Sequence, residues 1–148
     1  GIERYQGFTE TLRDLELPVS DHSICWYGSR DLDRLLHEKE TQFLKEMVTE
    51  SLSSCSAVVC YNDIIAYYLV DELQSAGYRL PEDMAVAAFD HTYFSSSNIL
   101  EVTTLSHEPH EMGTKAAEAV IKKLSGLPVS SQETRWKLNL KESTQTDR

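Results

Sequence analysis

The sequence is short of positive charge, and this shortage argues against one class of partner. Of its 148 residues, 14 are Lys or Arg and 24 are Asp or Glu, which gives a formal net charge of -10. A surface of this sign repels the phosphates of DNA and RNA at long range. We therefore expect no direct contact between this chain and nucleic acid.

Paired cysteines and long apolar runs are missing as well. The three cysteines, Cys25, Cys55 and Cys60, form no C-x-x-C pair, and reduced thiols in a cytoplasmic protein are the simplest interpretation. No apolar run is long enough to span a bilayer, and the start has no signal-peptide character, so we expect no membrane partner. We also expect the chain to be truncated at Gly1.

Motifs of catalysis are absent from the sequence. It has no G-x-S-x-G, no P-loop and no G-x-G-x-x-G after a strand. His107 and His110 are close to two glutamates, but Pro109 lies between them and no recognised metal-ligand spacing is met. The sequence therefore predicts no enzyme, no catalytic residue, no metal site and no cofactor.

What is present is an alternation of short apolar runs with longer amphipathic ones, without internal repeats. This alternation is typical of βαβ units and predicts an α/β fold with a mainly parallel sheet. The hydrophobic content of 41% suits one buried core. We predict helices over residues 2–16, 31–51, 64–75 and 109–125, and strands over residues 22–27, 57–60, 84–89, 103–106 and 135–140.

Polar residues follow three of the predicted strands. Asn62 and Asp63 come after one, Asp90 and His91 after another, and Gly28 to Arg30 after the first. The carboxyl ends of parallel strands share one edge, where ligands bind in open α/β sheets. Amide and carboxylate groups suit a ring with several hydroxyls, although Asn62 and Asp90 could instead cap the next helix or turn. The two roles are compatible.

Five segments, in register, resemble the lactose/galactose repressor family. They are Gly1-x-x-Arg4-x-x-Gly7-Phe8, Cys60-Tyr61-Asn62-Asp63, Gly77-Tyr78-Arg79-Leu80-Pro81-Glu82-Asp83-Met84, Ala88-Phe89-Asp90, and Val102-Thr103-Thr104-Leu105 with Met112-Gly113-x-x-Ala116-Ala117. The resemblance implies a periplasmic-binding-protein-like effector domain, a three-layer sandwich in which two lobes close over a sugar. It also divides the chain: residues 1–101 as the C-terminal lobe, residues 102–126 as the return crossing and a helix of the N-terminal lobe, and residues 127–148 as the final strand and tail. Most of the N-terminal lobe would then precede Gly1.

Four residues carry the family's ligand contacts over to this chain. Arg4 matches the arginine that clamps sugar hydroxyls, Asn62 the amide and Asp90 the carboxylate, while His107 falls on the crossing segment where the family places a polar pocket residue. The family has a second acidic residue where this chain has His91. The resemblance therefore implies ligand binding by Arg4, Asn62, Asp90 and His107, with one pocket-edge carboxylate missing.

Within the family, the segments at residues 60–63 and 81–84 look similar to arabinose-responsive repressors, which carry a winged-helix DNA-binding head. This likeness implies L-arabinose as the effector, operator DNA bound only through a head outside this chain, and a homodimer. The helix over residues 64–75 would join the dimer or simply pack in the core. The alternative is a periplasmic sugar receptor of a transport system, and the upstream sequence would distinguish the two.

Overall fold

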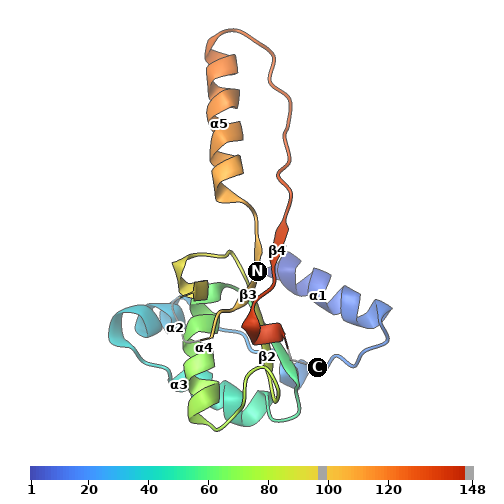
Figure 1. Cartoon of the computed structure of the whole chain (residues 1–148), viewed down its shortest axis with the longest axis vertical. Helices are drawn as coiled ribbons and strands as arrows, with labels where there is room; N and C mark the ends of the chain where they lie inside the picture. The colour runs from blue at the N-terminus through green and yellow to red at the C-terminus, as the bar shows by residue number, and fades with distance from the viewer. Residues whose placement is uncertain (97–99, 146–148) are drawn as a thin grey trace.

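The chain forms an α/β body from which one helix and its return segment project as an arm (Figure 1). The computed structural model describes residues 1–96 and 100–145, so residues 97–99 and the end of the predicted tail, 146–148, lie outside it. The helices are α1 (Ile2–Asp14), α2 (Ser29–Asp33), α3 (Gln42–Glu46), α4 (Asp63–Ser75) and α5 (Pro109–Leu124). The strands are β1 (Ala57–Cys60), β2 (Ala85–Phe89), β3 (Thr103–Ser106) and β4 (Lys137–Asn139).

The four strands form one sheet in the order β1-β2-β3-β4. β1 and β3 both run parallel to β2, whereas β4 is antiparallel to β3, with Lys137 opposite Ser106. The start of β4 therefore lies at the same edge as the carboxyl ends of the three parallel strands. This sheet confirms the predicted α/β class.

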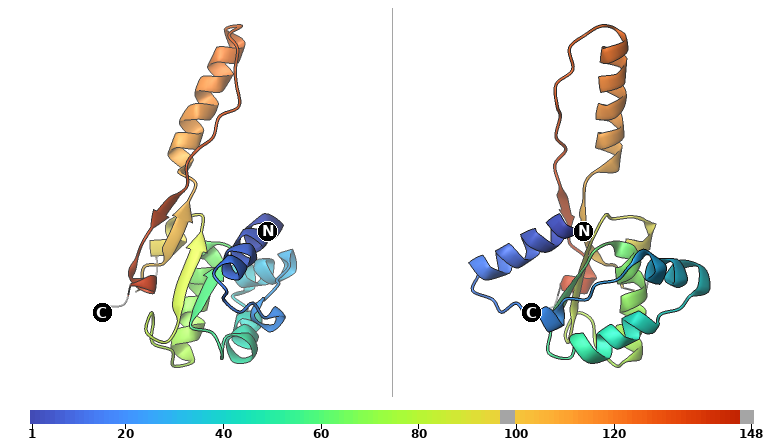
Figure 2. Two further views of the ribbon diagram at one scale, coloured as in Figure 1. Left: turned by 90° about the vertical axis from the view of Figure 1, so that its right-hand side faces the viewer. Right: turned by 180° about the vertical axis from the view of Figure 1, so that it is seen from behind.

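α4 supplies most of one side of the core. Its side chains Leu69 and Leu73 are 0% exposed, and the helix packs against β1 and β2. α1 and α4 lie on opposite sides of the strands, as in a layered sandwich (Figures 1 and 2). The predicted helix at the start of the chain is confirmed, but Thr9 is its one buried residue and its apolar stripe stays largely exposed.

The strand predicted over residues 22–27 is wrong. Asp21–Ser23 form a 3₁₀ turn, and the following residues run without strand pairing. The Ser20 side chain accepts from the His22 N–H at 3.3 Å, and its carbonyl accepts from the Ser23 hydroxyl at 2.6 Å. Such local hydrogen bonds give the backbone an alternative to a ladder. In the part of the chain that the structure describes, β1 is consequently an edge strand.

The single helix predicted over residues 31–51 is also wrong, because it is interrupted. α2 continues into a π-helical turn that ends at Lys39 with a left-handed φ of 59°, and α3 continues into a second π-helical turn. No apolar residue occurs between Leu36 and Phe43, so this stretch has no hydrophobic anchor in the core, although Lys39 Nζ donates to the Tyr68 hydroxyl at 2.8 Å. Leu35 and Leu44, both 0% exposed, anchor the helices on either side of the break.

α5 and its return segment stand away from the body (Figures 1 and 2). The helix has no buried residue, and its apolar Ile121 and Leu124 are 63% and 83% exposed. Lys115 links the two sides of the arm, since its Nζ donates to the Glu133 carbonyl at 2.8 Å.

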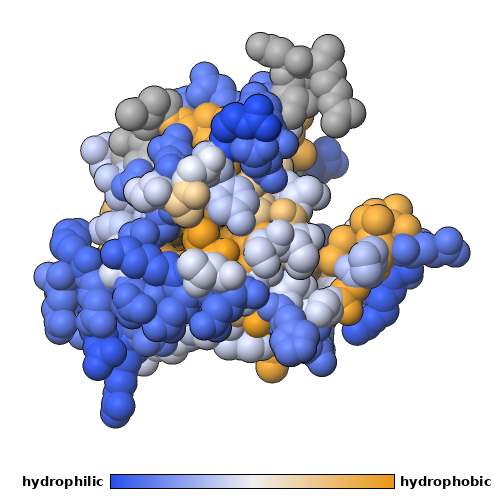
Figure 3. Space-filling model, turned by 90° about the horizontal axis from the view of Figure 1, so that it is seen from below, coloured by the Kyte–Doolittle hydropathy of each residue, from blue (hydrophilic) through white to orange (hydrophobic). Residues whose placement is uncertain are grey.

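Seen from below, the body is mostly hydrophilic, with apolar atoms over α1 at the right (Figure 3). None of the described helices combines the length and the hydrophobicity needed to cross a membrane.

Candidate functional site

Arg4 connects the start of α1 to the carboxyl edge of the sheet. Its guanidinium donates to Asp90 Oδ1 at 2.8 Å and to the Tyr61 carbonyl at 2.5 Å. The guanidinium carbon lies 4.7 Å from the centre of the Tyr61 ring and 4.6 Å from that of Phe89. Cation–π contacts and charge-assisted hydrogen bonds act together here. The carboxyl ends of strands β1 and β2 therefore meet at one arginine.

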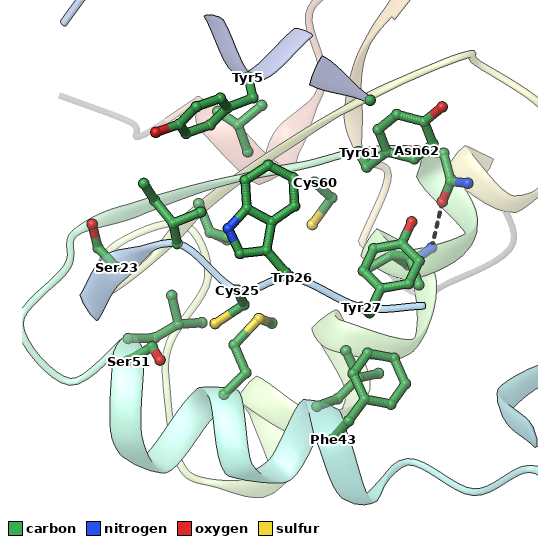
Figure 4. Close-up of a pocket in the computed structure, with 18 of the residues that line it drawn as sticks. Tyr5, Ser23, Cys25, Trp26, Tyr27, Phe43, Ser51, Cys60, Tyr61 and Asn62 are labelled. Atoms are coloured by element: carbon green, nitrogen blue, oxygen red, sulfur yellow. Dashed lines mark hydrogen bonds between the residues drawn. The ribbon is translucent and has the colours of Figure 1, made fainter. Parts of the chain in front are cut away.

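The residues after β1 turn directly into α4. Asn62 Oδ1 accepts from the Ile65 N–H at 3.0 Å, which makes Asn62 the N-cap (Figure 4). Asp63 is fully buried, and its Oδ2 accepts from the backbone N–H of Thr92. Its Oδ1 has no hydrogen-bond partner among residues 1–96 and 100–145, while the amino end of the helix favours its negative charge. Asp63 thereby holds the loop that carries Asp90 against the start of α4.

The turn after β2 has an unusual backbone. Asp90 and His91 have left-handed φ angles of 89° and 58°, a conformation that costs residues other than glycine about 1–3 kcal/mol. The Asp90 N–H donates to the Leu105 carbonyl at 3.0 Å, and His91 Nδ1 lies 2.6 Å from Thr104 Oγ1. The turn thus directs Asp90 to Arg4 and commits His91 to a buried hydroxyl of β3.

A cleft of about 580 Å³ opens beside this edge, between α1, residues 23–29, α3 and β1. Its volume is in the range of small-molecule sites, about 300–1,000 Å³. Figure 4 shows Tyr61 and Asn62 on one side of it and Ser51 on the opposite side. Arg4 also lines the cleft, whereas Asp90 and His107 do not. The rest of the lining is mainly aromatic and aliphatic, including Tyr5, Phe8, Trp26, Tyr27, Phe43, Met47 and Val58.

Two ionisable groups in the cleft wall stay protonated at neutral pH. Burial is the main cause that raises the pKa of Tyr27 to about 12. Cys60 and Tyr61 also raise this pKa, and Arg4 lowers it. Burial alone raises the pKa of Cys60 to about 12. The cleft therefore presents a neutral phenol and an unreactive thiol rather than anions.

His107 lies at the end of β3, apart from Arg4. Its ring centre is 5.6 Å from that of Trp136, which is in turn 6.4 Å from that of Phe89. Trp136 immediately precedes β4 and is 51% exposed. Sequence reasoning missed Phe89, which lines the cleft and packs on Arg4, and Trp136, whose ring lies next to Phe89. The one signal for Trp136 was its place at the start of the predicted last strand. The start of that strand lies at the carboxyl edge only if the strand runs antiparallel to its neighbour.

The geometry thus brings Arg4 and Asp90 into direct contact, places Asn62 with Arg4 in the lining of the cleft, and keeps His107 farther along the same edge. Hydrogen-bonding groups flanked by rings can bind a small polar ring without transforming it. Within the described ranges, no group of three or more His, Cys, Asp or Glu side chains is arranged to hold a metal ion.

The sequence profile of the periplasmic binding protein-like domain matches residues 1–144. The chain belongs to this family. The match spans both the body and the arm, so this periplasmic-binding-protein-like domain includes the carboxyl edge described above.

Known relatives of the domain are transcriptional repressors. The arabinose metabolism transcriptional repressor of Geobacillus stearothermophilus is 30% identical over 121 residues, which cover 82% of this chain and 32% of that protein. Its counterpart from Halalkalibacterium halodurans is 26% identical over 121 residues, 82% of this chain and 31% of the relative. The HTH-type transcriptional repressor PurR of Aliivibrio fischeri strain ES114 is 26% identical over 128 residues, which cover 82% of this chain and 35% of that protein. The chain spans about a third of the length of these relatives.

Solved structures show the same fold. The Escherichia coli transcriptional repressor ascG superposes with a TM-score of 0.79 at 22% identity, over 96% of this chain and 49% of that one. A complex of the transcriptional regulator CelR with cellobiose superposes with a TM-score of 0.71 at 19% identity, over 96% of this chain and 42% of that one. The predicted periplasmic-binding-protein-like architecture is confirmed by these similarities.

Proposed function

We propose that this domain senses a small sugar, L-arabinose, for a transcriptional repressor whose DNA-binding head lies outside the chain. The observation that carries the proposal is the contact between Arg4 and Asp90, 2.8 Å long, which joins the start of α1 to the end of β2 beside a cleft. Both side chains are about a quarter exposed, at 27% and 26%, so they remain open to a ligand. The identity to an arabinose metabolism repressor supports L-arabinose.

In this proposal Arg4 and Asp90 bind neighbouring hydroxyls of one sugar. The planar guanidinium donates to two oxygens at once, and the carboxylate accepts from hydroxyls while offsetting the positive charge. Asn62 supplies its amide N–H₂ group, since its oxygen caps α4. His107 contributes a ring nitrogen from the crossing segment, at the side of the sugar away from Asn62.

The mechanism we propose is a population shift. Residues 1–101 form one lobe, residues 102–126 cross to a second lobe that includes α5, and residues 127–148 supply the final strand and tail. The bare apolar face of α5 supports this division, because such a face needs a partner. A sugar that touches both lobes more fully in the closed state favours closure, which changes operator binding by a cytoplasmic homodimer.

The regulator is favoured over a periplasmic transport receptor by the relatives, which are named as transcriptional repressors. A thermal-shift screen of the full-length protein with L-arabinose, D-xylose, D-ribose and D-galactose tests the effector, because a bound ligand raises the melting temperature. We expect a selective response to L-arabinose. A response to another sugar alone would reject L-arabinose, and no response would reject sugar sensing.

The site assignment is tested by Arg4→Ala and Asp90→Ala in the full-length protein. Each change leaves a charge without its partner and removes ligand hydrogen bonds, so calorimetry should show L-arabinose binding weakened by about 2 kcal/mol or more. Arg13→Ala, at the exposed far end of α1, is the matched control and should bind normally. Unchanged affinity in both site variants, with melting temperatures preserved, would reject the assignment.

A further inference from the structure

A row of rings crosses the carboxyl edge of the sheet, with Arg4 inside it. Neighbouring members of the row lie 6.5 Å, 4.7 Å, 4.6 Å, 6.4 Å and 5.6 Å apart. The second and third distances join the Arg4 guanidinium carbon to a ring centre, and the others join two ring centres. We name this row the edge ladder; in order, its members are Tyr27, Tyr61, Arg4, Phe89, Trp136 and His107. Every strand of the sheet has a member at or next to its end on this edge, so the ladder is a product of the topology.

Trp136 is the member of the ladder with the largest ring. It is 51% exposed. The plane of its indole makes an angle of 84° with the Phe89 ring and 71° with the His107 ring, so neither neighbour stacks flat on the indole. An exposed indole one ring away from a charged, hydrogen-bonding pair resembles the composition of ligand sites, where an apolar body and polar groups converge. Phe89 alone separates Trp136 from Arg4 in the ladder.

We propose that Trp136 is the stacking wall of the sugar site and selects the cyclic form of the ligand. A pyranose above Phe89 would have its hydroxyls held by Arg4 and Asp90, while its C–H face packs on the indole. An open-chain alditol has the same hydroxyls but no fixed apolar face. Trp136 therefore discriminates between ring and open chain, which hydrogen bonds alone do less well. This inference rests on the proposed function and adds a specificity residue to it.

The test compares Trp136→Leu and Trp136→Phe in the full-length protein, by calorimetry with L-arabinose and with L-arabitol. Removing one aromatic contact should weaken L-arabinose binding about five- to tenfold in Trp136→Leu and only about twofold in Trp136→Phe, which keeps a ring. Binding of L-arabitol should hardly change, so the preference for the cyclic sugar falls. Leu138→Ala is the matched control, since Leu138 lies two residues after Trp136 in β4, is 58% exposed and is outside the ladder.

Fluorescence gives a second readout. The sequence has two tryptophans, Trp26 and Trp136. In the full-length protein, Trp136→Phe should reduce the emission change on adding L-arabinose more than Trp26→Phe does, because the sugar stacks on the indole of Trp136.

The outcomes separate the two proposals. Wild-type binding of L-arabinose with the same ring-to-alditol preference in Trp136→Leu would overturn the stacking role and leave the sensor proposal intact. An equal loss in Leu138→Ala would also overturn it, by showing a general effect of strand β4. Absence of sugar binding by the wild type would overturn the proposed function and this inference together.

Discussion

Two helices of similar length, α4 and α5, have opposite surroundings. α4 has 13 residues, of which six are buried, whereas α5 has 16 residues and none is buried. Their starts differ too, because the Asn62 side chain caps α4 while Glu108 makes no side-chain cap bond to α5. Both segments are nevertheless helical. The comparison shows that the local sequence forms each helix, whereas packing partners decide what it contributes to stability.

The largest test of this comparison is a pair of leucine deletions. Leu69→Ala in α4 removes a side chain that is 0% exposed, and such a core cavity should lower the free energy of unfolding by about 2–5 kcal/mol. Leu124→Ala in α5, at a position 83% exposed, should change it by less than about 0.5 kcal/mol. Urea unfolding of this chain followed by circular dichroism measures both. Equal losses would break the comparison, since they would mean that α5 is packed in solution.

A smaller effect is expected at the two helix starts. Asn62→Ala removes the side-chain acceptor for the Ile65 N–H and should cost about 1 kcal/mol, whereas Asn62→Asp keeps an acceptor and should cost less. Glu108→Ala removes no cap bond and should leave the melting temperature within error. Asn62→Asp should also separate capping from ligand binding, because it loses the amide N–H₂ group. A Glu108→Ala loss as large as that of Asn62→Ala would contradict the contrast between the caps.

The smallest effect concerns alkaline pH. The pKa of Tyr27 rises from an ordinary 10.0 to about 12 in the fold, so above pH 10 the unfolded chain loses this proton first. The associated stability is present below about pH 10 and is lost as the pH rises towards 12. Tyr27→Phe should therefore lose less stability than the wild type between about pH 9 and pH 11, by under about 1 kcal/mol because Tyr27 is partly exposed.

Urea midpoints of both proteins at the two pH values measure the difference. α5 contains no tyrosine, so this alkaline loss belongs to the body and sharpens its contrast with the arm. An identical pH dependence in wild type and Tyr27→Phe would contradict the burial of the phenol.

Periodicity and composition predicted much of the fold. The apolar run at residues 57–60 and that at 84–89 are strands, and the helix signals at Asn62 and Pro109 begin α4 and α5. The two errors arose where local chemistry competed with the pattern. Ser20 forms hydrogen bonds that make a turn where apolar residues predicted a strand. The helix breaks in the polar stretch after Leu36, although the periodicity on both sides of that stretch predicted one continuous helix.

The candidate site was predicted in part. Arg4, Asn62 and Asp90 were selected from motifs and from strand-end positions, and their roles as ligand residues stay predictions. The sequence could not reveal that the Phe89 ring contacts Arg4 and that the Trp136 ring lies next to Phe89 along the edge. Residues 89 and 136 are far apart in the chain, and their contact depends on a sheet register and on the antiparallel direction of β4.

By itself the sequence determined which segments become helices and buried strands, since hydrophobic period and capping residues act over a few positions. It also determined the family of the chain through its motifs. Only the tertiary structure decided that α4 is buried while α5 is bare, and that a guanidinium and five rings follow one another across the sheet. The physical reason is that burial and cross-strand contact depend on which distant segments pair, whereas periodicity and capping residues act within one segment.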